Sequence, residues 1–336
     1  MEKIIYDVVG LGNAMVDVLA RVGDGFLKER SLPKGNMILV DAVKAGEIYK
    51  DLDPERQVSG GSAANTVAGI ASLGGTPAFI GKIHNDELGQ IFKRDIGVAG
   101  VDFYTTPLTE GPSTGRSIVL ITPDAERSMF TYLGAATNIS KKDVDENKIS
   151  SAKVLYLEGY LWDEKYAKQA MLKACYLARK HNKKIALSLS DKLCVERHRR
   201  QFMPLIKKYV DILFANEEEV KALYEKEDLF EILETIKHDV NIAAITRNDK
   251  GSVVVNGRTK TFVEAEKVEY VVDSTGAGDL YAAGFLYGYT TNRTLGTCAL
   301  IGSIAAAEII SHYGARPEVS LRGFVRNKLQ QYGKTI

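Results

Sequence analysis

The heptapeptide Asp273-Ser274-Thr275-Gly276-Ala277-Gly278-Asp279 is the most informative stretch of the chain. The apolar residues Tyr270-Val271-Val272 precede it, and Leu280-Tyr281-Ala282-Ala283-Gly284-Phe285 follows with the small residues of a tightly packed helix. Glycines at a helix start leave backbone N–H groups uncovered, and these groups and the helix dipole favour an anion. The segment therefore predicts an anion-binding helix N-terminus.

Asp279 lies in the first turn of this expected helix, beside the expected anion. A carboxylate there can accept the proton of a substrate hydroxyl that attacks a phosphorus atom. The alternative interpretation is a capped helix whose glycines only permit close packing. The heptapeptide by itself does not separate the two.

The segments around it predict an α/β protein. Short apolar runs at 154–157, 185–189, 212–214 and 242–245 indicate buried strands, and helical patterns separate them. Such alternation predicts parallel strands with helices on both faces. Two further β-like runs, 115–121 and 128–133, belong to an expected small β lobe.

Composition excludes several classes of protein. The 336 residues contain 44 Lys and Arg against 43 Asp and Glu, a formal net charge of +1 that gives no general attraction to nucleic acid or to an anionic membrane. No apolar run approaches the length of a membrane span, and residues 1–7 lack a signal-peptide core. Three distant cysteines argue against a disulfide framework, so we expect a cytoplasmic protein.

Two more motifs accompany the heptapeptide. Gly60-Gly61-Ser62-Ala63-Ala64-Asn65-Thr66 opens a small-residue helix, and Asn216-Glu217-Glu218-Glu219 follows the strand at 212–214. Together, and in this order, the three motifs resemble the signatures of the ribokinase-like (PfkB) family of carbohydrate and nucleoside kinases. The resemblance spans most of the chain.

This resemblance implies a three-layer α/β/α core with a mostly parallel central sheet and a small β-sheet lid. We expect residues 1–14, 42–103 and 135–336 to form the large nucleotide-binding and catalytic domain, and residues 15–41 and 104–134 to form the lid. The implied roles are Asp279 as base, the amides of Gly276, Ala277 and Gly278 on the phosphates, and contacts from Gly60, Gly61, Ser62 and Asn65 to ribose hydroxyls.

Asn13 and Asp17, just past the first strand, offer an amide and a carboxylate four residues apart. A carboxylate can accept from two vicinal hydroxyls, although a turn-forming Asn and an exposed Asp would fit equally well. The pattern resembles the adenosine kinases, which implies ribose contacts. Arg127 resembles the lid arginine that reaches the transferred phosphate; a solvated hairpin arginine is the alternative.

A nucleoside also needs a surface for its base. Candidates are the apolar and aromatic residues of the lid and facing loops, each of which could instead be simple core: Met15, Leu39, Leu133 and Tyr160. Thr275 stands where some eukaryotic adenosine kinases have Asn, so the choice among purines stays open.

On the nucleotide side, Asn216 and Glu219 are implied to organise Mg²⁺ and phosphate, with Glu219 as the candidate metal residue. Thr246 and Gly251 are expected near the ATP phosphates, and Ser303 belongs to a small-residue helix that an adenine could approach. Gly314-Ala315-Arg316-Pro317 lies where some relatives build a monovalent-cation site, which leaves a K⁺ requirement open.

The sequence therefore predicts ATP-dependent phosphorylation of a ribonucleoside 5′-hydroxyl, foremost adenosine to AMP in purine salvage. Within the same chemistry, an inosine or guanosine kinase and a sugar kinase acting on ribose or another furanose stay open. A non-catalytic ligand sensor and a dinucleotide oxidoreductase are the alternatives from other classes. Expected partners are small molecules only, and the expected assembly is a monomer or homodimer.

Overall fold

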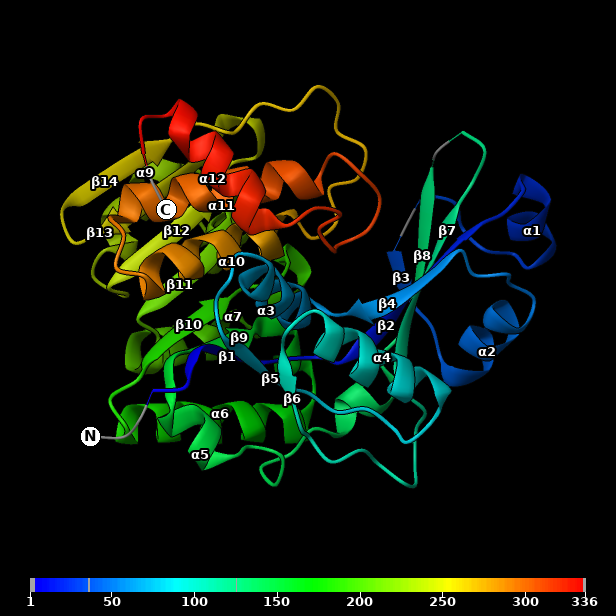
Figure 1. The fold of residues 1–336 in the computed structure, drawn as a ribbon. Helices are drawn as coiled ribbons and strands as arrows, with labels where there is room; N and C mark the ends of the chain where they lie inside the picture. Colours follow the sequence, from blue (N-terminus) through cyan, green and yellow to red (C-terminus); the bar gives the residue numbers. More distant parts are fainter. Residues whose placement is uncertain (1–3, 36, 125, 335–336) are drawn as a thin grey trace.

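The computed structural model describes residues 4–35, 37–124 and 126–334, and its described strands form two sheets (Figure 1). The larger sheet has nine strands in the order β14-β13-β12-β11-β10-β9-β1-β5-β6. Their bounds are β1 Tyr6–Leu11, β5 Pro77–Ile80, β6 Asp102–Phe103, β9 Ala152–Glu158, β10 Lys184–Ser188, β11 Ile212–Asn216, β12 Ile242–Thr246, β13 Ser252–Asn256 and β14 Thr259–Val263.

Pairing from β6 to β12 is parallel throughout, and the two pairings at the other edge, β12–β13 and β13–β14, are antiparallel. Parallel strands need both faces covered. Successive residues of β1 accordingly point into different cores: Val8 into one and Val9 into the other. The expected three-layer fold class is confirmed.

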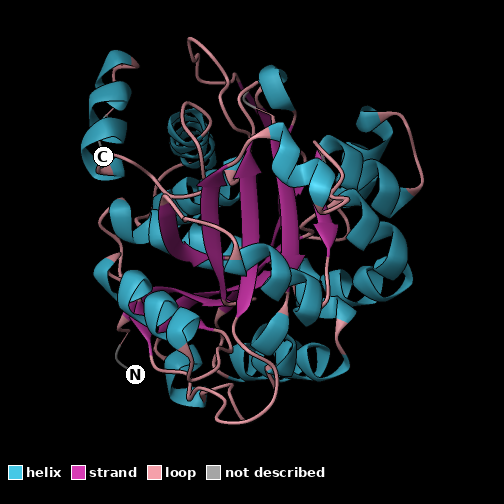
Figure 2. Cartoon of the chain, turned by 90° about the vertical axis from the view of Figure 1, so that its right-hand side faces the viewer, coloured by secondary structure: helices cyan, strands magenta, loops and turns pink. Residues whose placement is uncertain are grey.

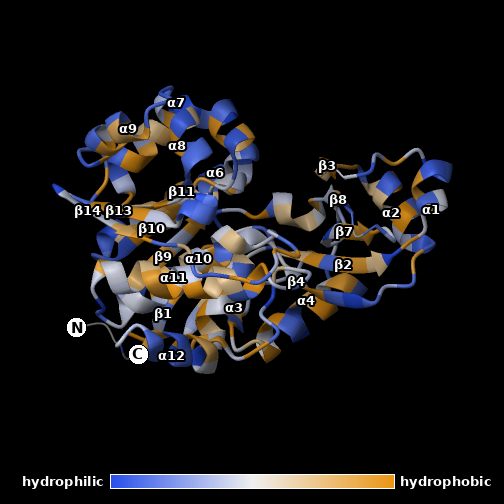
Figure 3. Cartoon of the chain, turned by 90° about the horizontal axis from the view of Figure 1, so that it is seen from above, coloured by the Kyte–Doolittle hydropathy of each residue, from blue (hydrophilic) through white to orange (hydrophobic). Residues whose placement is uncertain are grey.

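Helices cover the two faces of this sheet. One core contains residues of α3 (Ser62–Ser72), α4 (Glu87–Val98), α10 (Ala277–Thr290), α11 (Leu295–Ile309) and α12 (Leu321–Gln331). The other contains residues of α5 (Glu146–Ser150), α6 (Lys165–Lys180), α7 (Lys192–Tyr209), α8 (Glu217–Tyr224) and α9 (Leu229–Ile236). In Figure 3 hydrophobic residues gather on the strands and on α10 and α11, and hydrophilic residues on outer helices such as α7 and α12.

Helix α7 begins at Lys192, well before its basic cluster. Asp191 caps it by accepting a hydrogen bond from the Cys194 amide (2.6 Å), which fixes the first turn at Lys192. The basic residues 197–200 therefore lie inside the helix and not at its start.

The smaller sheet has the order β3-β8-β7-β2-β4 and lies to one side with α1 (Asp24–Glu29) and α2 (Ala42–Lys50). Figure 2 views the molecule from this side, with strands bordered by helices. Four strands come from the segments expected to form the lid: β2 Met15–Arg21, β3 Met37–Leu39, β7 Gly115–Ile121 and β8 Arg127–Tyr132.

The fifth strand, β4 (Arg56–Gly60), comes from the segment 42–103 that was assigned to the large domain. It pairs antiparallel with β2, with Ser59 opposite Val16, and leads directly into the turn before α3. The boundary of the small sheet is corrected accordingly, and its movement as a lid stays a prediction.

Three 3₁₀ turns complete the described elements: η1 (Gly134–Asn138), η2 (Gly159–Asp163) and η3 (Asn248–Lys250). None of the helices in the described part of the chain combines the length and apolar character that a membrane crossing requires.

Candidate active site

A cavity of about 1460 Å³ opens where the parallel strands end. Asn13, Glu158, Ser188, Asn216 and Thr246 lie at or just past the carboxyl ends of β1, β9, β10, β11 and β12, and all of them line it. Parallel strands end at one edge of a sheet, and ligands of open α/β sheets bind there. Residues of the small sheet line the same cavity.

The fold brings the sequence-predicted residues together at this cavity, which we call the active-site cavity. Of the predicted set, only Gly60 is not among the lining residues, which include Asn13, Met15, Asp17, Leu39, Gly61, Ser62, Asn65, Arg127, Leu133, Tyr160, Asn216, Glu219, Thr246, Gly251, Thr275, Gly276, Ala277, Gly278, Asp279 and Ser303.

Residues 273–279, the anion loop, lead into α10 as expected. Gly276 has φ +80°, and a Cβ atom there would lie 2.8 Å from the Ala315 Cβ atom, so the position requires glycine. A Cβ atom on Gly278 would meet no described atom within 4 Å. The first turn of α10 therefore leaves space in which an anion can approach its amides.

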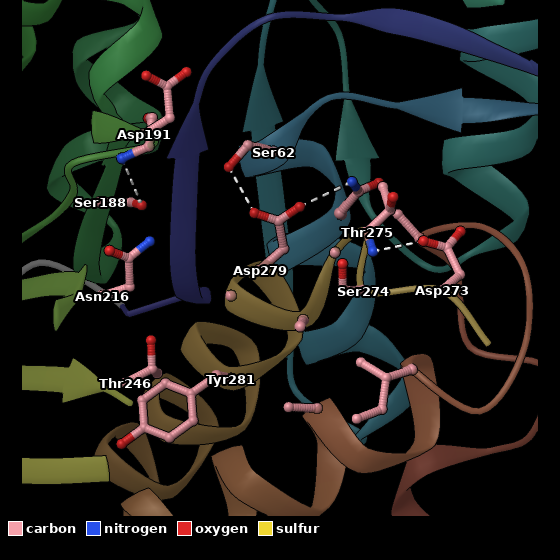
Figure 4. Close-up of a pocket in the computed structure, with 18 of the residues that line it drawn as sticks. Ser62, Ser188, Asp191, Asn216, Thr246, Asp273, Ser274, Thr275, Asp279 and Tyr281 are labelled. Carbon is pink, nitrogen blue, oxygen red and sulfur yellow. Dashed lines mark hydrogen bonds between the residues drawn. The ribbon is translucent and has the colours of Figure 1, made fainter. Parts of the chain in front are cut away.

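Asp279 is held between two donors from α3 (Figure 4). Ser62 Oγ donates to Asp279 Oδ1 (2.7 Å), and Asn65 Nδ2 donates to Asp279 Oδ2 (3.0 Å). Withdrawal from water raises the pKa of Asp279, and the two hydrogen bonds and the charge of Arg316 oppose that rise. The carboxylate is fixed in orientation and made more basic than a free aspartate.

The turn between β4 and α3 presses against the residues that follow β1. Gly61 has φ +103°, and a Cβ atom there would lie 2.1 Å from the Asn13 carbonyl oxygen. A Cβ atom on Gly60 would lie 2.4 Å from the Asp17 carboxylate. The paired glycines thus allow two chain segments to meet next to the part of the cavity that Asp17 lines.

Asp17 lines the cavity without a hydrogen bond from any described residue to its carboxylate. Removal from water raises its pKa to about 6, the charge of Arg316 opposes that rise, and the charge of Asp279 adds to it. An ionised carboxylate with free lone pairs can accept hydroxyl groups of a ligand.

Sequence reasoning missed Glu158, which is fully buried at the end of β9. Its Oε1 accepts from the backbone N (2.8 Å) and Nδ2 (2.6 Å) of Asn13, and its Oε2 accepts from the Ala63 amide (2.8 Å). Burial raises its pKa to about 7 against these hydrogen bonds. A charged residue ending an apolar strand, at the edge where ligands bind, was the available signal.

Arg127 contacts the anion loop through its first residue. It forms an ion pair with Asp273, a buried carboxylate that also accepts from the amides of Thr275 (2.7 Å) and Gly314 (3.0 Å). Burial lowers the pKa of Arg127. The guanidinium therefore lies beside the loop, and its action on a phosphate stays a prediction.

Asn216 and Glu219 form a capping box at the start of α8. Asn216 N and Nδ2 donate to Glu219 (3.0 and 2.7 Å), and the Glu219 amide donates back to Asn216 Oδ1 (2.8 Å). Burial raises the pKa of Glu219 to about 7. Both Glu219 oxygens thus accept hydrogen bonds from Asn216, and the role of the pair toward a metal or phosphate stays a prediction.

No group of three or more acidic, His or Cys side chains in the described part of the chain could hold a metal ion by itself. Further along the cavity, Thr246 ends β12 and Gly251 closes the turn into β13. Ser303 Oγ accepts from the Glu266 amide (2.8 Å) and donates to the Glu264 carbonyl (3.2 Å), which ties residues 264–266 to α11.

The four base-binding candidates share the cavity although they come from different elements. Met15 belongs to β2, Leu39 to β3, Leu133 follows β8, and Tyr160 lies in η2. Leu39 is 65% exposed, which is unusual for an apolar strand residue that faces a cavity. Met15, Leu39 and Leu133 give the small-sheet side of the cavity an apolar character.

The known proteins that this chain resembles belong to one family, but their names give different substrates. The chain matches the model of the pfkB family of carbohydrate kinases over residues 41–321. The adenosine kinase from Sinorhizobium meliloti is 48% identical, with a TM-score of 0.88 over 96% of this chain and 99% of that one. A probable sugar kinase from Rhizobium etli is 43% identical, with a TM-score of 0.88 over 98% of each chain.

Curated relatives carry a different name. The 5-dehydro-2-deoxygluconokinase of Bacillus subtilis is 24% identical over 331 residues, which cover 94% of this chain and 93% of that protein. Its counterpart from Listeria monocytogenes is 27% identical over 76% of this chain and 82% of that protein. The similar proteins are thus kinases that differ in their acceptor.

Proposed function

Since the chain belongs to the pfkB family of carbohydrate kinases, a family of phosphotransferases with an alcohol group as acceptor, we propose that its acceptor is the 5′-hydroxyl of a ribonucleoside, foremost adenosine. ATP would donate the phosphoryl group. One observation carries the proposal: the same cavity presents the Asp17 carboxylate, which no described residue pairs, and, from the small sheet, the apolar side chains of Met15, Leu39 and Leu133.

The polar part of the cavity suits a ribose. Asp17 can accept from two adjacent hydroxyls at once, and the Asn13 amide beside it is held in place by Glu158. Asn65 Oδ1 is buried and has no hydrogen-bond partner among the described residues. A buried acceptor of this kind is costly unless a ligand hydroxyl satisfies it.

The charges of the cavity argue against a sugar acid such as 5-dehydro-2-deoxygluconate. Such an acceptor carries a carboxylate, which would need a cation near its binding site. Of the cations that line the cavity, Arg127 and Arg197 are paired with Asp273 and Asp163, respectively. Lys250 and Lys267 follow β12 and β14, respectively, and so lie in the segments proposed to surround ATP. Asp17, Glu158 and Asp279 make the acceptor side negative.

The chemistry requires a base, an anion site and exclusion of water. Asp279 takes the 5′-hydroxyl proton as that oxygen attacks the γ-phosphorus of ATP, and the β–γ bridging oxygen leaves with ADP. Amides at the start of α10 stabilise the charge of the transferred phosphoryl group. Closure of the small sheet would keep water out and would bring Arg127, here paired with Asp273, toward the phosphates.

The nucleotide side fits ATP with Mg²⁺. Residues of the anion loop, Thr246, Gly251 and residues 264–266 would surround the phosphates and the adenine. Bound Mg²⁺ neutralises phosphate charge in this reaction class. Asn216 and Glu219 would orient its water ligands, because their own hydrogen bonds fix both side chains.

A panel of acceptors tests the proposal. ADP formation with ATP and Mg²⁺ is measured for adenosine, inosine, guanosine, cytidine, ribose and 5-dehydro-2-deoxygluconate. We expect the highest kcat/KM for adenosine. A higher value for inosine or guanosine would keep the nucleoside class and change the base. A higher value for ribose or the sugar acid would overturn the nucleoside proposal.

A further inference from the structure

Arg316, in the connection between α11 and α12, is 7% exposed and does not line the active-site cavity. Its three guanidinium nitrogens donate to three acceptors: Nε to the Ser59 carbonyl (2.8 Å), Nη1 to the Ala64 carbonyl (2.9 Å) and Nη2 to Ser59 Oγ (2.9 Å). The side chain therefore joins the α11–α12 connection to β4 and to the first turn of α3.

Burying a guanidinium without a carboxylate in direct contact costs folding free energy, because the charge is removed from water. No direct ion pair to Arg316 is found among residues 4–35, 37–124 and 126–334. Burial lowers its pKa to about 10, against the charges of Asp95, Asp17 and Asp279, which favour the cation. Its counter-charges are thus nearby carboxylates, two of which line the active-site cavity.

The partners of Arg316 are themselves fixed. Asp95 Oδ2 accepts from the amide (2.7 Å) and the hydroxyl (2.6 Å) of Ser59. Ser59 directly precedes the Gly60–Gly61 turn, whose first glycine lies against the Asp17 carboxylate. Ala64 lies between Ser62 and Asn65, the two residues that hold Asp279. Arg316 therefore supports the turn beside Asp17 and the first turn of α3, which holds Asp279, without lining the cavity itself.

We propose that Arg316 is a positioning residue of phosphoryl transfer, which fixes the β4–α3 turn and supplies the positive charge that balances the carboxylates Asp17 and Asp279. The proposal rests on the proposed function for the roles of these two aspartates. The guanidinium does not touch the substrate; it acts through Ser59, Ala64 and its electric field.

The charge has a defined direction of effect. Withdrawal from water raises the pKa of both aspartates, and Arg316 lowers both. Loss of the cation raises the two pKa values further, so both groups stay protonated to higher pH. The acid limb of the kcat/KM profile should move upward, and each unit of movement costs about tenfold in kcat/KM below the limb.

The first experiment compares pH profiles of Arg316→Met, Arg316→Lys and Arg56→Met. Arg56 is the matched control, because its cation acts on Arg316 yet its side chain is 39% exposed and, among the described residues, pairs with Glu318 alone at 3.9 Å. The titratable groups coupled to Asp279 are the same in all variants: Asp17, Tyr156, Glu158, Tyr160 and Glu219.

We expect Arg316→Met to shift the acid limb upward by about one unit, a tenfold loss of kcat/KM below the limb. Arg316→Lys should leave the pH of the acid limb unchanged, because it keeps the positive charge. It should raise KM for the acceptor about tenfold, because lysine cannot make all three hydrogen bonds. The proposal would be overturned if folded Arg316→Met showed its acid limb at the wild-type pH. An equal shift of the acid limb in Arg56→Met would also overturn it.

A second experiment needs no turnover. Melting temperatures at pH 8 are measured for the wild type, Asp17→Asn, Arg316→Met and the double variant. Removing the Asp17 charge should raise the melting temperature in both backgrounds, because the raised pKa disfavours the ionised carboxylate in the fold, and should raise it more where Arg316 is absent. An equal effect of Asp17→Asn in both backgrounds contradicts the charge-balancing role, and does so even if adenosine proves not to be a substrate.

Folding failure is also informative. If Arg316→Met alone does not fold, the double variant should recover folded protein. If neither folds, the Arg316→Lys profile decides: an unmoved acid limb with a raised KM supports the proposal, and a moved limb or an unchanged KM overturns it. Nucleoside turnover by the wild type tests the proposed function separately.

Discussion

At the scale of single residues, Asp279 has the environment that a general base requires. Ser62 and Asn65 orient its two oxygens, and withdrawal from water raises its pKa. Ser62 and Asn65 come from the Gly60–Thr66 motif, more than 200 residues away in sequence. Two of the sequence motifs thus meet at one carboxylate, which makes the spatial constellation more informative than either motif.

Replacing this carboxylate by its amide should abolish most turnover and spare binding. We expect Asp279→Asn to lower kcat about a thousandfold, the typical contribution of a positioned general base. Its melting temperature and its affinity for the nucleoside should stay near the wild-type values. Asp53→Asn, an exposed carboxylate outside the cavity, is the control. A kcat within tenfold of the wild type would exclude Asp279 as the base.

Asp17 makes nucleoside binding dependent on pH. Its pKa is raised to about 6, so the carboxylate is ionised above this pH and protonated below it. Only the ionised form accepts from two hydroxyls without donating. Calorimetric titration without ATP should therefore show Kd rising as the pH falls from about 7 to about 5. 2′-Deoxyadenosine should bind more weakly and with less pH dependence; identical profiles for the two ligands would contradict this role.

At the scale of elements, the turn between β4 and α3 depends on Gly61. Its φ of +103°, and the 2.1 Å that would separate a Cβ atom at this position from the Asn13 carbonyl oxygen, leave no room for a side chain. We expect Gly61→Ala to cost about 2 kcal/mol or more in stability and to raise the acceptor KM. Both changes follow because the turn supports Asn13 and Asp17.

Gly46→Ala is the matched control for this substitution. Gly46 lies inside α2, and a Cβ atom there would meet no described atom within 4 Å. Alanine should stabilise that helix by roughly 0.5 to 1 kcal/mol. Melting temperature and KM are measured for both variants. Equal effects of the two substitutions would show that the Gly61 conformation is not specifically required.

Strand β3 offers a test of base recognition. Leu39 is 65% exposed and lines the cavity, so a bound base would cover it. Truncation in Leu39→Ala should raise KM for adenosine by about tenfold, the loss of roughly 1.5 kcal/mol of apolar burial, with kcat nearly unchanged. Val43→Ala, a similarly exposed site in α2 away from the cavity, should leave KM alone. KM for ribose should not depend on Leu39.

Most of these elements could be predicted because each has a recognisable pattern of residues within its own short segment. Gly-Ala-Gly before a small-residue helix predicted the start of α10, and the alternation of short apolar runs with helices predicted the parallel sheet. The pairing of β4 with β2 carries no comparable signal, because Arg56–Gly60 has neither an apolar alternation nor a hairpin turn. Long-range register had to come from the fold.

The same limit applies to the candidate site. The three motifs identified residues whose type fits a ligand, and the structure gathers nearly all of them at one cavity. The contacts of Glu158, Arg316 and Asp95 with residues up to 257 positions away could not be inferred from the sequence. The pairing of Arg127 with Asp273 is likewise a tertiary contact between the small sheet and the anion loop.

At the scale of the whole molecule, the two sheets contribute different kinds of side chain to the active-site cavity. The large sheet ends in the polar residues Asn13, Glu158, Ser188, Asn216 and Thr246, and the small sheet brings apolar side chains to the same cavity. A hydroxyl acceptor and a phosphate donor would meet between them, at Asp279. Arg127 apart, which pairs with Asp273, the apolar side chains of the small sheet could change without altering the anion loop, and relatives with the same fold are named for different acceptors.

The proposed reaction is the phosphorylation of adenosine at its 5′ position. The most direct test incubates the protein with ATP, Mg²⁺ and adenosine and identifies the product by ³¹P NMR and mass spectrometry, with 5′-deoxyadenosine as the acceptor that lacks the reacting hydroxyl. We predict adenosine 5′-monophosphate from adenosine and no phosphorylated product from 5′-deoxyadenosine. An unmodified adenosine pool alongside a phosphorylated sugar or sugar acid would contradict the claim.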